Sequence, residues 1–355
     1  MILAIDLGST SFKAALFDRD LKRLAAGECR LSYLSPTDDA MELAVEVVHV
    51  SVRDAVATAR IDADDISAIG ITSQAQTFTV SDSTGRPKRP FISWRDARAS
   101  DQAKALTAEP SLADFPEHTS FHAPTPAMQI SLLRRLQLAE PGVVKETDLV
   151  EQLGSHVVRA LSGQSWMDEN LAAMCGLYSL RENAWWPPAL DVCGLRREQL
   201  PRVSPIGTSC CTTGDAAGAF GLPAGVPIVL AGNDQTAGAY GARLDETGGL
   251  LITLGTAEVV YVCSDEMPEA RPGCVRGVYP DGKFYRLVVA EAGGIAEAVA
   301  TLGVDPKRMP VHVAGGGSRS PARVKQLARR LGTSVTPVDA DPLLGAARMA
   351  AACLG

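Results

Sequence analysis

The chain has 355 residues and a mass of 37.4 kDa, which is long for one hydrophobic core and favours two domains. Its 34 Lys and Arg against 41 Asp and Glu give a formal charge of −7, and 46% of its residues are hydrophobic. This composition excludes a disordered or fibrous protein, and the charge argues against nucleic acid or an anionic membrane as a partner. Asp6 interrupts the apolar start MILAID and no apolar stretch is long enough to span a membrane, so we expect a cytoplasmic protein.

The first part of the chain has the pattern of an α/β unit. Apolar runs predict strands, and apolar residues at a 3.6-residue period predict a helix that covers them. The strands are expected at 1–7, 12–18, 24–33, 65–74 and 76–82, and the helix at 41–59.

Residues 97–200 are mostly helical in pattern, with loops expected at the proline-bearing stretches HAPTPA and WWPPAL. The Gly- and Pro-rich stretch GLPAGVP (221–227) is the best linker candidate, because it precedes the strongly apolar strand PIVLAG. We therefore expect two domains, 1–223 and 224–355.

An internal repeat connects the two expected domains. The stretches 3–17 (LAIDLGSTSFKAALF) and 250–264 (LLITLGTAEVVYVCS) share an apolar strand, a Leu-Gly corner, hydroxyl residues and a second apolar strand. Two related hairpins could face each other across a cleft between the domains. Chance similarity is the alternative, since strand-glycine-strand patterns are common.

The turn of the first hairpin suits a phosphate and a metal ion. Glycine lets a backbone approach a phosphate closely, and the following residues add N–H groups, hydroxyls and one cation. Asp6 supplies a hard oxygen ligand for Mg²⁺. The phosphate candidates are Gly8, Ser9, Thr10, Ser11 and Lys13, with a smaller set, Gly255 and Thr256, in the second hairpin. For each hairpin a tight turn with a polar tip is the alternative.

A strand followed by three glycines and a helix occurs near the end of the chain, in VHVAGGGSRSPARVKQLARRLG (311–332). Ser318 and Ser320 are candidate helix caps, and a helix start reached through glycine can bind a phosphate or a nucleotide edge. The alternative is a plain glycine turn.

Asp234 is the best candidate for a catalytic base. In IVLAGNDQTAGAYGA it follows an apolar strand and opens a helix of small residues, which would point its carboxylate from the strand end into a cleft. Together with the three candidate phosphate-binding motifs of the chain, this carboxylate suggests phosphoryl transfer to a hydroxyl. An N-cap aspartate is the alternative.

These motifs together resemble the FGGY carbohydrate kinases, of the actin-like ATPase superfamily, over nearly the whole chain. Five of them occur in the order of the family: a first phosphate motif, a sugar-site region, a catalytic-base motif, a second phosphate motif and an adenosine motif. They are DLGSTSFK, GITSQAQ with SWRDARA, GNDQTAGAYGA, LGTAEVV and AGGGSRSP, and LLGAARMAA is similar to the late helix of the family.

The resemblance implies two actin-like (ribonuclease H-like) domains with a cleft between them, and ATP and Mg²⁺ as cofactors. Asp6 would serve Mg²⁺, and Asp234 would take the proton of a sugar hydroxyl. Thr10, Ser11, Lys13, Gly255 and Thr256 would hold the ATP phosphates, Gly315, Gly316, Gly317 and Ser318 would lie near the adenosine, and Gln76, Trp94, Arg95 and Gln235 would line the sugar pocket. A core tryptophan is the alternative interpretation of Trp94.

The chain departs from the family in two places. Glycerol kinases carry Arg-Glu and D-xylulokinases Met-His where this chain has Ala75 and Gln76, so neither substrate transfers. Only the 58 residues 257–314 separate Thr256 from Gly315, where the family has a much longer helical stretch, so the second domain is shortened.

We therefore expect an ATP-dependent kinase that phosphorylates a small sugar or polyol. The alternative is a sugar- or nucleotide-binding pseudokinase that lost turnover together with the missing segment. The sequence names neither the substrate nor the oligomeric state, and it leaves open a homodimer in which a second subunit covers the gap.

Overall fold

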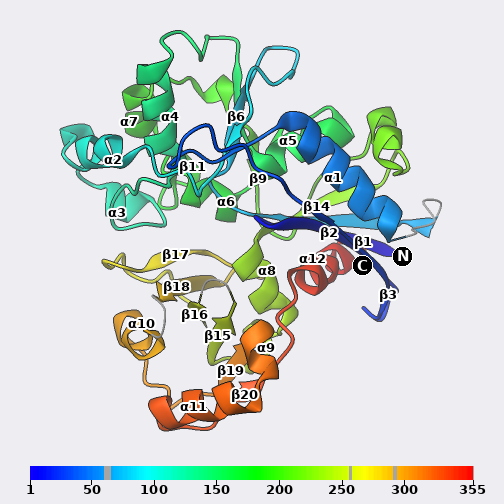
Figure 1. The fold of residues 1–355 in the computed structure, drawn as a ribbon, viewed down its shortest axis with the longest axis vertical. Coiled ribbons are helices and arrows are strands. Elements are labelled where there is room, and N and C mark those ends of the chain that lie inside the picture. Colours follow the sequence, from blue (N-terminus) through cyan, green and yellow to red (C-terminus); the bar gives the residue numbers. More distant parts are fainter. Residues whose placement is uncertain (60–64, 256–257, 291–293, 355) are drawn as a thin grey trace.

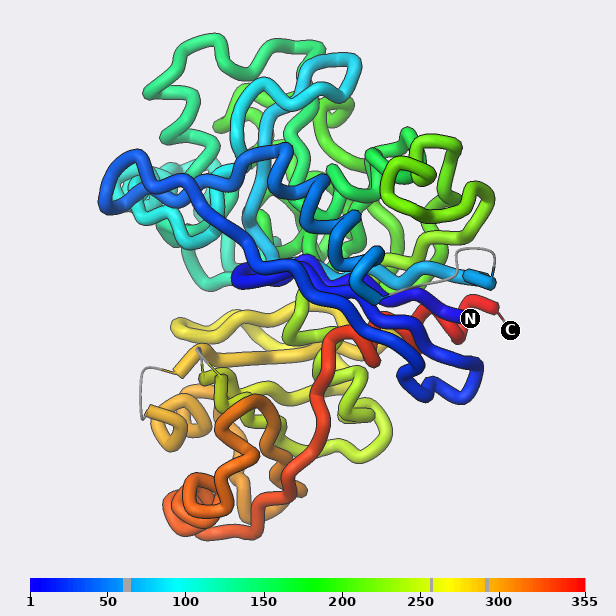
Figure 2. Tube along the Cα trace, turned by 45° about the vertical axis from the view of Figure 1, so that its right-hand side comes forward, coloured from blue at the N-terminus to red at the C-terminus, as the bar shows by residue number. Residues whose placement is uncertain are grey.

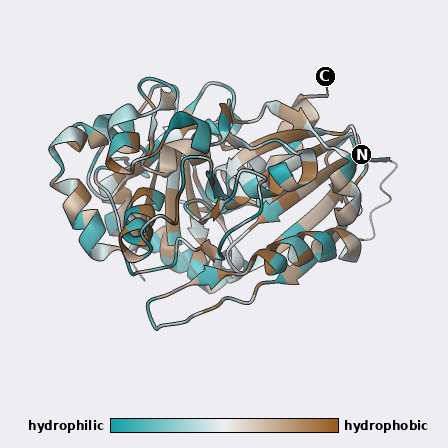
Figure 3. Ribbon diagram, turned by 90° about the horizontal axis from the view of Figure 1, so that it is seen from above, coloured by the Kyte–Doolittle hydropathy of each residue, from teal (hydrophilic) through white to brown (hydrophobic). Residues whose placement is uncertain are grey.

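The computed structural model describes residues 1–59, 65–255, 258–290 and 294–354. Over these residues the chain forms two six-stranded sheets, one in each half of the molecule, with a helical region beside the first (Figure 1). Hydrophobic colour is concentrated on the strands in the interior, and hydrophilic colour on the surrounding helices and loops (Figure 3). The α/β class expected from the sequence is confirmed.

The first sheet is formed by strands from three separate parts of the chain and is covered by two helices. Their bounds are Ile2–Leu7 (β1), Ser11–Phe17 (β2), Arg23–Arg30 (β3), Ala68–Ser73 (β5), Ser209–Thr212 (β13), Pro227–Asn233 (β14), Val45–Thr58 (α1) and Pro342–Ala352 (α12). The strand order is β13-β14-β5-β1-β2-β3, and β14, β5 and β1 are parallel. β1 and β5 are buried along their whole length, as expected for parallel strands with cover on both faces.

Side chains of β1 alternate between two cores. Leu3, Ile5 and Leu7 pack in the core that includes α1, whereas Ile2 and Ala4 pack in the core that includes α12. By the same alternation Asp6 faces the side of α12 and of the second half of the molecule.

The strands and the helix expected in the first 82 residues are confirmed, with shifted ends. The third strand stops at Arg30, and the helix expected from residue 41 begins at Val45 because Glu42–Leu43 form a short strand, β4. The strand expected at 76–82 is β6, Phe78–Ser81.

The helical region beside the first sheet, residues 74–208, also contains strands, so residues 97–200 are mixed rather than mostly helical. Its strands β6, β7 and β8 pair with β4, which precedes α1, in a small sheet of order β4-β7-β6-β8, and several further short strands lie between the helices. HAPTPA is a loop as expected, but WWPPAL is not: Pro187 opens a helix there, because a proline in the first helical turn lacks only an N–H that has no partner within the helix. The remaining bounds are Phe91–Ile92 (β7), Leu149–Gln152 (β8), Trp166–Asp168 (β9), Tyr178–Ser179 (β10), Ala184–Trp185 (β11), Arg202–Ser204 (β12), Ser100–Thr107 (α2), Phe115–His118 (α3), Gln129–Ala139 (α4), Leu153–Ser162 (α5), Glu169–Met174 (α6), Pro187–Val192 (α7), Pro110–Leu112 (η2), Arg197–Gln199 (η3) and Asp215–Phe220 (η4).

The second sheet lies in the other half of the molecule (Figure 2). Its strands are Leu250–Leu254 (β15), Glu258–Ser264 (β16), Val275–Val278 (β17), Phe284–Ala290 (β18), Val311–Ala314 (β19) and Thr336–Pro337 (β20), in the order β17-β18-β16-β15-β19-β20. The helices of this half are Asp234–Gly241 (α8), Leu244–Thr247 (α9), Ile295–Leu302 (α10), Pro321–Leu331 (α11) and the short Gly316–Arg319 (η5).

The internal repeat is confirmed as a structural repeat. β1 and β2 form an antiparallel hairpin with β5 parallel to β1, and β15 and β16 form a second hairpin with β19 parallel to β15. Each half therefore brings a hairpin turn and the end of a neighbouring parallel strand to one edge of its sheet.

Two helices connect the halves. α8 follows the last strand of the first sheet, and α12 returns from the second half to pack on β1, β5 and α8. α8 and α12 are so close that Gly241 and Gly345 have no room for a Cβ. The domain division expected at 223/224 stays a proposal. β14, which follows GLPAGVP, pairs with β5, so the last strand of the first sheet ends at Asn233.

Candidate active site

Asp6 and Asp234 come to the same edge of the first sheet. Asp6 is at the end of β1, Asp234 directly follows β14, and β5 runs parallel between the two strands. In register, Asp6 lies beside Thr72, and Ser73 lies beside Asn233. Because the carboxyl ends of parallel strands share one edge, the topology brings the two carboxylates together.

Asp6 is a buried carboxylate with an unsatisfied oxygen. Its side chain is 5% exposed, and no donor among the described residues reaches Oδ1. Burial and the negative charge of Asp234 raise the pKa of Asp6 to about 7, while Lys13 opposes the shift. Lys13 faces Asp6 directly across the β1–β2 hairpin.

Such an orphaned hard oxygen fits a divalent cation. Among the described residues no three His, Cys, Asp or Glu side chains cluster so as to hold a metal ion by themselves. A magnesium ion at Asp6 would therefore take its other ligands from phosphates and water, as Mg²⁺ commonly does.

The phosphate candidates of the first hairpin form its turn. Gly8 lies beside Asp6, and a Cβ on Gly8 would come within 3.7 Å of its Oδ2. Gln74, which the sequence analysis missed, donates from Nε2 to the Gly8 carbonyl (3.0 Å) and fixes the turn to the end of β5. Tyr33 donates its hydroxyl to the Ser9 carbonyl (2.8 Å). Thr10 is exposed at the tip, whereas Ser11 is buried at the start of β2.

Asp234 is the first residue of α8 but does not cap it. The cap is Asn233, whose side-chain oxygen accepts from the Thr236 N–H (2.9 Å), so the alternative interpretation of Asp234 is wrong. The Asp234 carboxylate accepts the neighbouring Gln235 N–H (2.9 Å). Burial raises its pKa, against the lowering effects of that N–H and of Lys13.

The second hairpin and the glycine loop meet at the edge of the second sheet. Thr253 of β15 is in register with Ala314 of β19, so Gly255 and Gly315 follow neighbouring parallel strands. Gly315 has φ +82°, and a Cβ there would lie 2.8 Å from the Leu254 carbonyl, so only glycine fits. Thr256 lies outside the described residues.

The serines of the glycine loop have different roles. Ser320 caps α11, whereas the Ser318 hydroxyl donates to the Gly315 carbonyl (2.8 Å) and stabilises the turn itself. The expected cap at Ser318 is therefore wrong. Gly316 has open space on its Cβ side, while Gly317 is packed against Leu254 and Arg323.

Trp94 and Arg95 stand on an exposed segment after β7. Trp94 is 39% exposed, so the alternative of a core tryptophan is wrong. The guanidinium of Arg95 lies over the Tyr33 ring, 5.7 Å from its centroid. Since Tyr33 also binds Ser9, this contact connects the segment to the β1–β2 turn.

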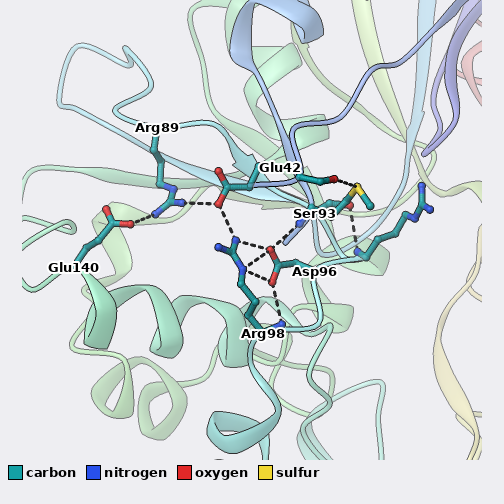
Figure 4. A network of polar contacts seen from close by, with 9 residues as sticks. Glu42, Arg89, Ser93, Asp96, Arg98 and Glu140 are labelled. Carbon is teal, nitrogen blue, oxygen red and sulfur yellow. Dashed lines mark hydrogen bonds and ion pairs between the residues drawn. The ribbon is translucent and has the colours of Figure 1, made fainter. Parts of the chain in front are cut away.

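An ion-pair network holds this exposed segment in place (Figure 4). Arg98 binds Asp96 (2.5 Å) and Glu42 (2.7 Å). Arg89 bridges Glu42 (3.3 Å) and Glu140 (3.0 Å). Asp96 and Arg98 of the SWRDARA motif thus fix the loop, while Trp94 and Arg95 of the same motif remain exposed.

Gln76 and Gln235, the other two sugar-site candidates, differ in their surroundings. Gln76 is buried with φ +70°, donates from Nε2 to the Met174 carbonyl (2.6 Å) and accepts from the Gln129 N–H (2.9 Å). Its amide therefore ties two helices of the helical region together. Gln235 is partly exposed in the first turn of α8, beside Asp234.

Comparison with known proteins identifies the family. The profile described as "FGGY family of carbohydrate kinases, N-terminal domain" matches residues 1–241. The chain belongs to the FGGY family of carbohydrate kinases. The resemblance of the chain to the FGGY family is thereby confirmed, while LGTAEVV and AGGGSRSP lie beyond the matched residues. No helix of the described residues is long and apolar enough to cross a membrane.

Curated FGGY relatives are longer than this chain. It is 30% identical over 269 residues to glycerol kinase from Brucella ovis, a match that covers 72% of this chain and 52% of the relative. It is 28% identical over 266 residues to autoinducer-2 kinase from Klebsiella pneumoniae, covering 72% and 49%. The chain thus spans about half the length of the curated relatives it matches.

Solved structures of FGGY kinases share the fold. Xylulose kinase from Lactobacillus acidophilus superposes with a TM-score of 0.88 at 16% identity, covering 100% of this chain and 89% of that one. Gluconate kinase from the same organism gives a TM-score of 0.86 at 16% identity, covering 100% and 89%. These likenesses show that the chain has the fold of these sugar kinases.

Proposed function

We propose that this FGGY chain transfers the γ-phosphate of ATP to a hydroxyl of a small sugar or polyol, with Asp234 as the general base. The observation that carries the proposal is the pairing of Asp6 and Asp234 at one edge of the first sheet. One carboxylate has a buried free oxygen for a cation, and the other stands in the first turn of α8, where it accepts the Gln235 N–H.

The two carboxylates suit different tasks. Asp234 would accept the proton of the substrate hydroxyl, and burial raises its pKa toward the working range of a base. Asp6 would hold Mg²⁺, which when bound neutralises charge on the phosphates. Lys13 and the N–H groups of the turn from Gly8 would add positive charge on the same side.

The phosphate and nucleotide ligands are divided between the two halves. The β1–β2 turn would grip the phosphates from the first sheet, and Gly255 and the loop from Gly315 to Ser318 would approach from the second. Trp94, Arg95 and Gln235 are the exposed or partly exposed candidates for sugar contacts. We propose the cytoplasm as the location of this activity, as expected from the sequence.

The names of the relatives support a small hydroxyl acceptor but do not select one. A coupled ADP-release assay with Mg²⁺ over ketoses, polyols and sugar acids tests the proposal. We expect sugar-dependent ADP release that Asp234→Asn abolishes and that Asp101→Asn, a change of an exposed carboxylate on α2, leaves intact. Binding of ATP and sugar without any transfer would instead indicate the pseudokinase.

A further inference from the structure

Asn170 is a fully buried amide that uses all of its hydrogen-bonding capacity next to Asp234. Its Oδ1 accepts from the backbone N–H (3.0 Å) and the side-chain amide (2.9 Å) of Asn233. Its Nδ2 donates to Thr236 Oγ1 (3.2 Å) and to the Val278 carbonyl (2.8 Å). An asparagine amide has two donors and two acceptor sites, so none is left over.

Two of these partners define the corner from which Asp234 projects. Asn233 is the cap of α8 and the immediate neighbour of Asp234, and Thr236 lies in the first turn of the helix. The corner is tight, because Gly232 has φ +72° and a Cβ there would lie 3.1 Å from Asn170 Oδ1. The direction of the first turn of α8 therefore depends on Asn170.

The other partner belongs to the second sheet. Val278 ends β17, and Thr236 also contacts the Tyr261 hydroxyl of β16 (3.1 Å). Asn170 itself lies on α6, in the first half of the molecule. One side chain thus connects the helical region, the Asp234 corner and the second sheet.

We propose that Asn170 is a positioning residue that orients the Asp234 carboxylate for proton transfer and makes this orientation depend on the packing of β17 against α6. The inference rests on the proposed function, because it assigns the direction of the base. Tilting of the first turn after loss of Asn170 would misplace the carboxylate while the phosphate ligands of the β1–β2 turn keep their places.

Steady-state kinetics of two variants with a matched control test the role. Asn170→Ala removes all four hydrogen bonds, and Asn170→Asp keeps the acceptor for Asn233 while removing both donors. Gln199→Ala is the control, because Gln199 is also a buried amide, donating to the Lys145 and Asp148 carbonyls far along the chain from α8.

We expect Asn170→Ala to lower kcat about 100-fold, as a misplacement of about 1 Å can do, with ATP affinity by calorimetry within about threefold of wild type. The decrease in kcat should be smaller for Asn170→Asp than for Asn170→Ala. Gln199→Ala should lose thermal stability but keep kcat in the folded protein. Hydrogen exchange should rise at 231–240 and 275–279 in Asn170→Ala, and mainly at 275–279 in Asn170→Asp.

The outcomes separate the two hypotheses. A wild-type kcat in folded Asn170→Ala, or an equal loss of kcat in Gln199→Ala at matched stability, overturns the role of Asn170 and leaves the kinase intact. No ADP release by the wild type on any sugar overturns the proposed function and the role in transfer with it. Unchanged exchange at 275–279 in both Asn170 variants overturns the coupling to the second sheet.

Discussion

Asp6 lies near the end of β1 and Asp234 directly after β14, on either side of β5, and the negative charge of Asp234 adds to burial in raising the pKa of Asp6 to about 7. Two carboxylates that face the same edge repel each other unless a cation or a proton intervenes. Binding of a magnesium–nucleotide complex would therefore reduce the repulsion between these two carboxylates.

Asp234→Asn should abolish phosphoryl transfer and leave sugar affinity within a few-fold, because the change removes a proton acceptor and keeps the shape of the side chain. Turnover is measured by ADP release, and sugar binding by calorimetry. Turnover comparable to wild type would rule out Asp234 as the base.

Asp6→Asn should stabilise the metal-free protein while weakening Mg²⁺-dependent ATP binding. A folded pKa of about 7, above the ordinary value of 3.8, means that this group stabilises the fold at low pH and that the contribution is lost as the pH rises through 7. The variant should therefore gain about 1–3 kcal/mol in unfolding free energy at pH 8, and little at pH 4. Denaturant unfolding in EDTA at both pH values provides the measurement, and equal gains at the two would contradict the prediction.

A partly buried pair of histidines should make stability depend on pH. His49 Nε2 and His156 Nε2 lie 2.9 Å apart between α1 and α5, with Arg159 and Glu151 against His156 and Glu46 near His49. Burial, with the charges of His156 and Arg159, lowers the pKa of His49. Its stabilising contribution is present above pH 6.5 and is lost as the pH falls, because the unfolded chain then binds a proton that the folded chain resists.

His49→Gln should therefore reduce the fall in melting temperature between pH 7 and pH 5.5. His122→Gln is a suitable control, since His122 is exposed in the loop 122–127. A fall as steep in His49→Gln as in the wild type would show that other groups dominate this pH range.

The shortened second domain should weaken selection of the nucleotide base. Only the 58 residues 257–314 separate Thr256 from Gly315, and Val289, near the end of β18, is 58% exposed. A lost apolar shelf is worth about 1–3 kcal/mol, or roughly ten- to two-hundred-fold in discrimination. We expect similar kcat/KM for ATP and GTP with one accepted sugar. Strong preference for ATP by a chain whose mass in solution is that of a monomer would sink this expectation.

The sequence predicted those parts of the site that depend on local pattern. Neighbouring residues in the sequence are enough to predict the Leu-Gly corners of the two hairpins, Asp6 at a strand end and Asp234 at a helix start. Long-range contacts could not be predicted from the sequence. Asn170 accepts a hydrogen bond from Asn233, 63 positions away, and no local pattern around α6 indicates this partner.

Local ambiguity accounts for the remaining differences. Either Asn233 or Asp234 can cap a helix, and only the backbone decides that Asn233 does. The stretch before PIVLAG has the composition of a linker, but parallel strand order is set by packing, which places β14 beside β5 in the first sheet.

The return of α12 to the first sheet has a consequence for how the protein is made. β1 and β5 leave the ribosome early, but the face of that sheet carrying Ala4 and Gly70 packs against α12, at residues 342–352. A nascent chain therefore carries an open apolar face until residues 342–352 have been synthesised, which is the kind of surface that chaperones bind and that aggregates when left alone.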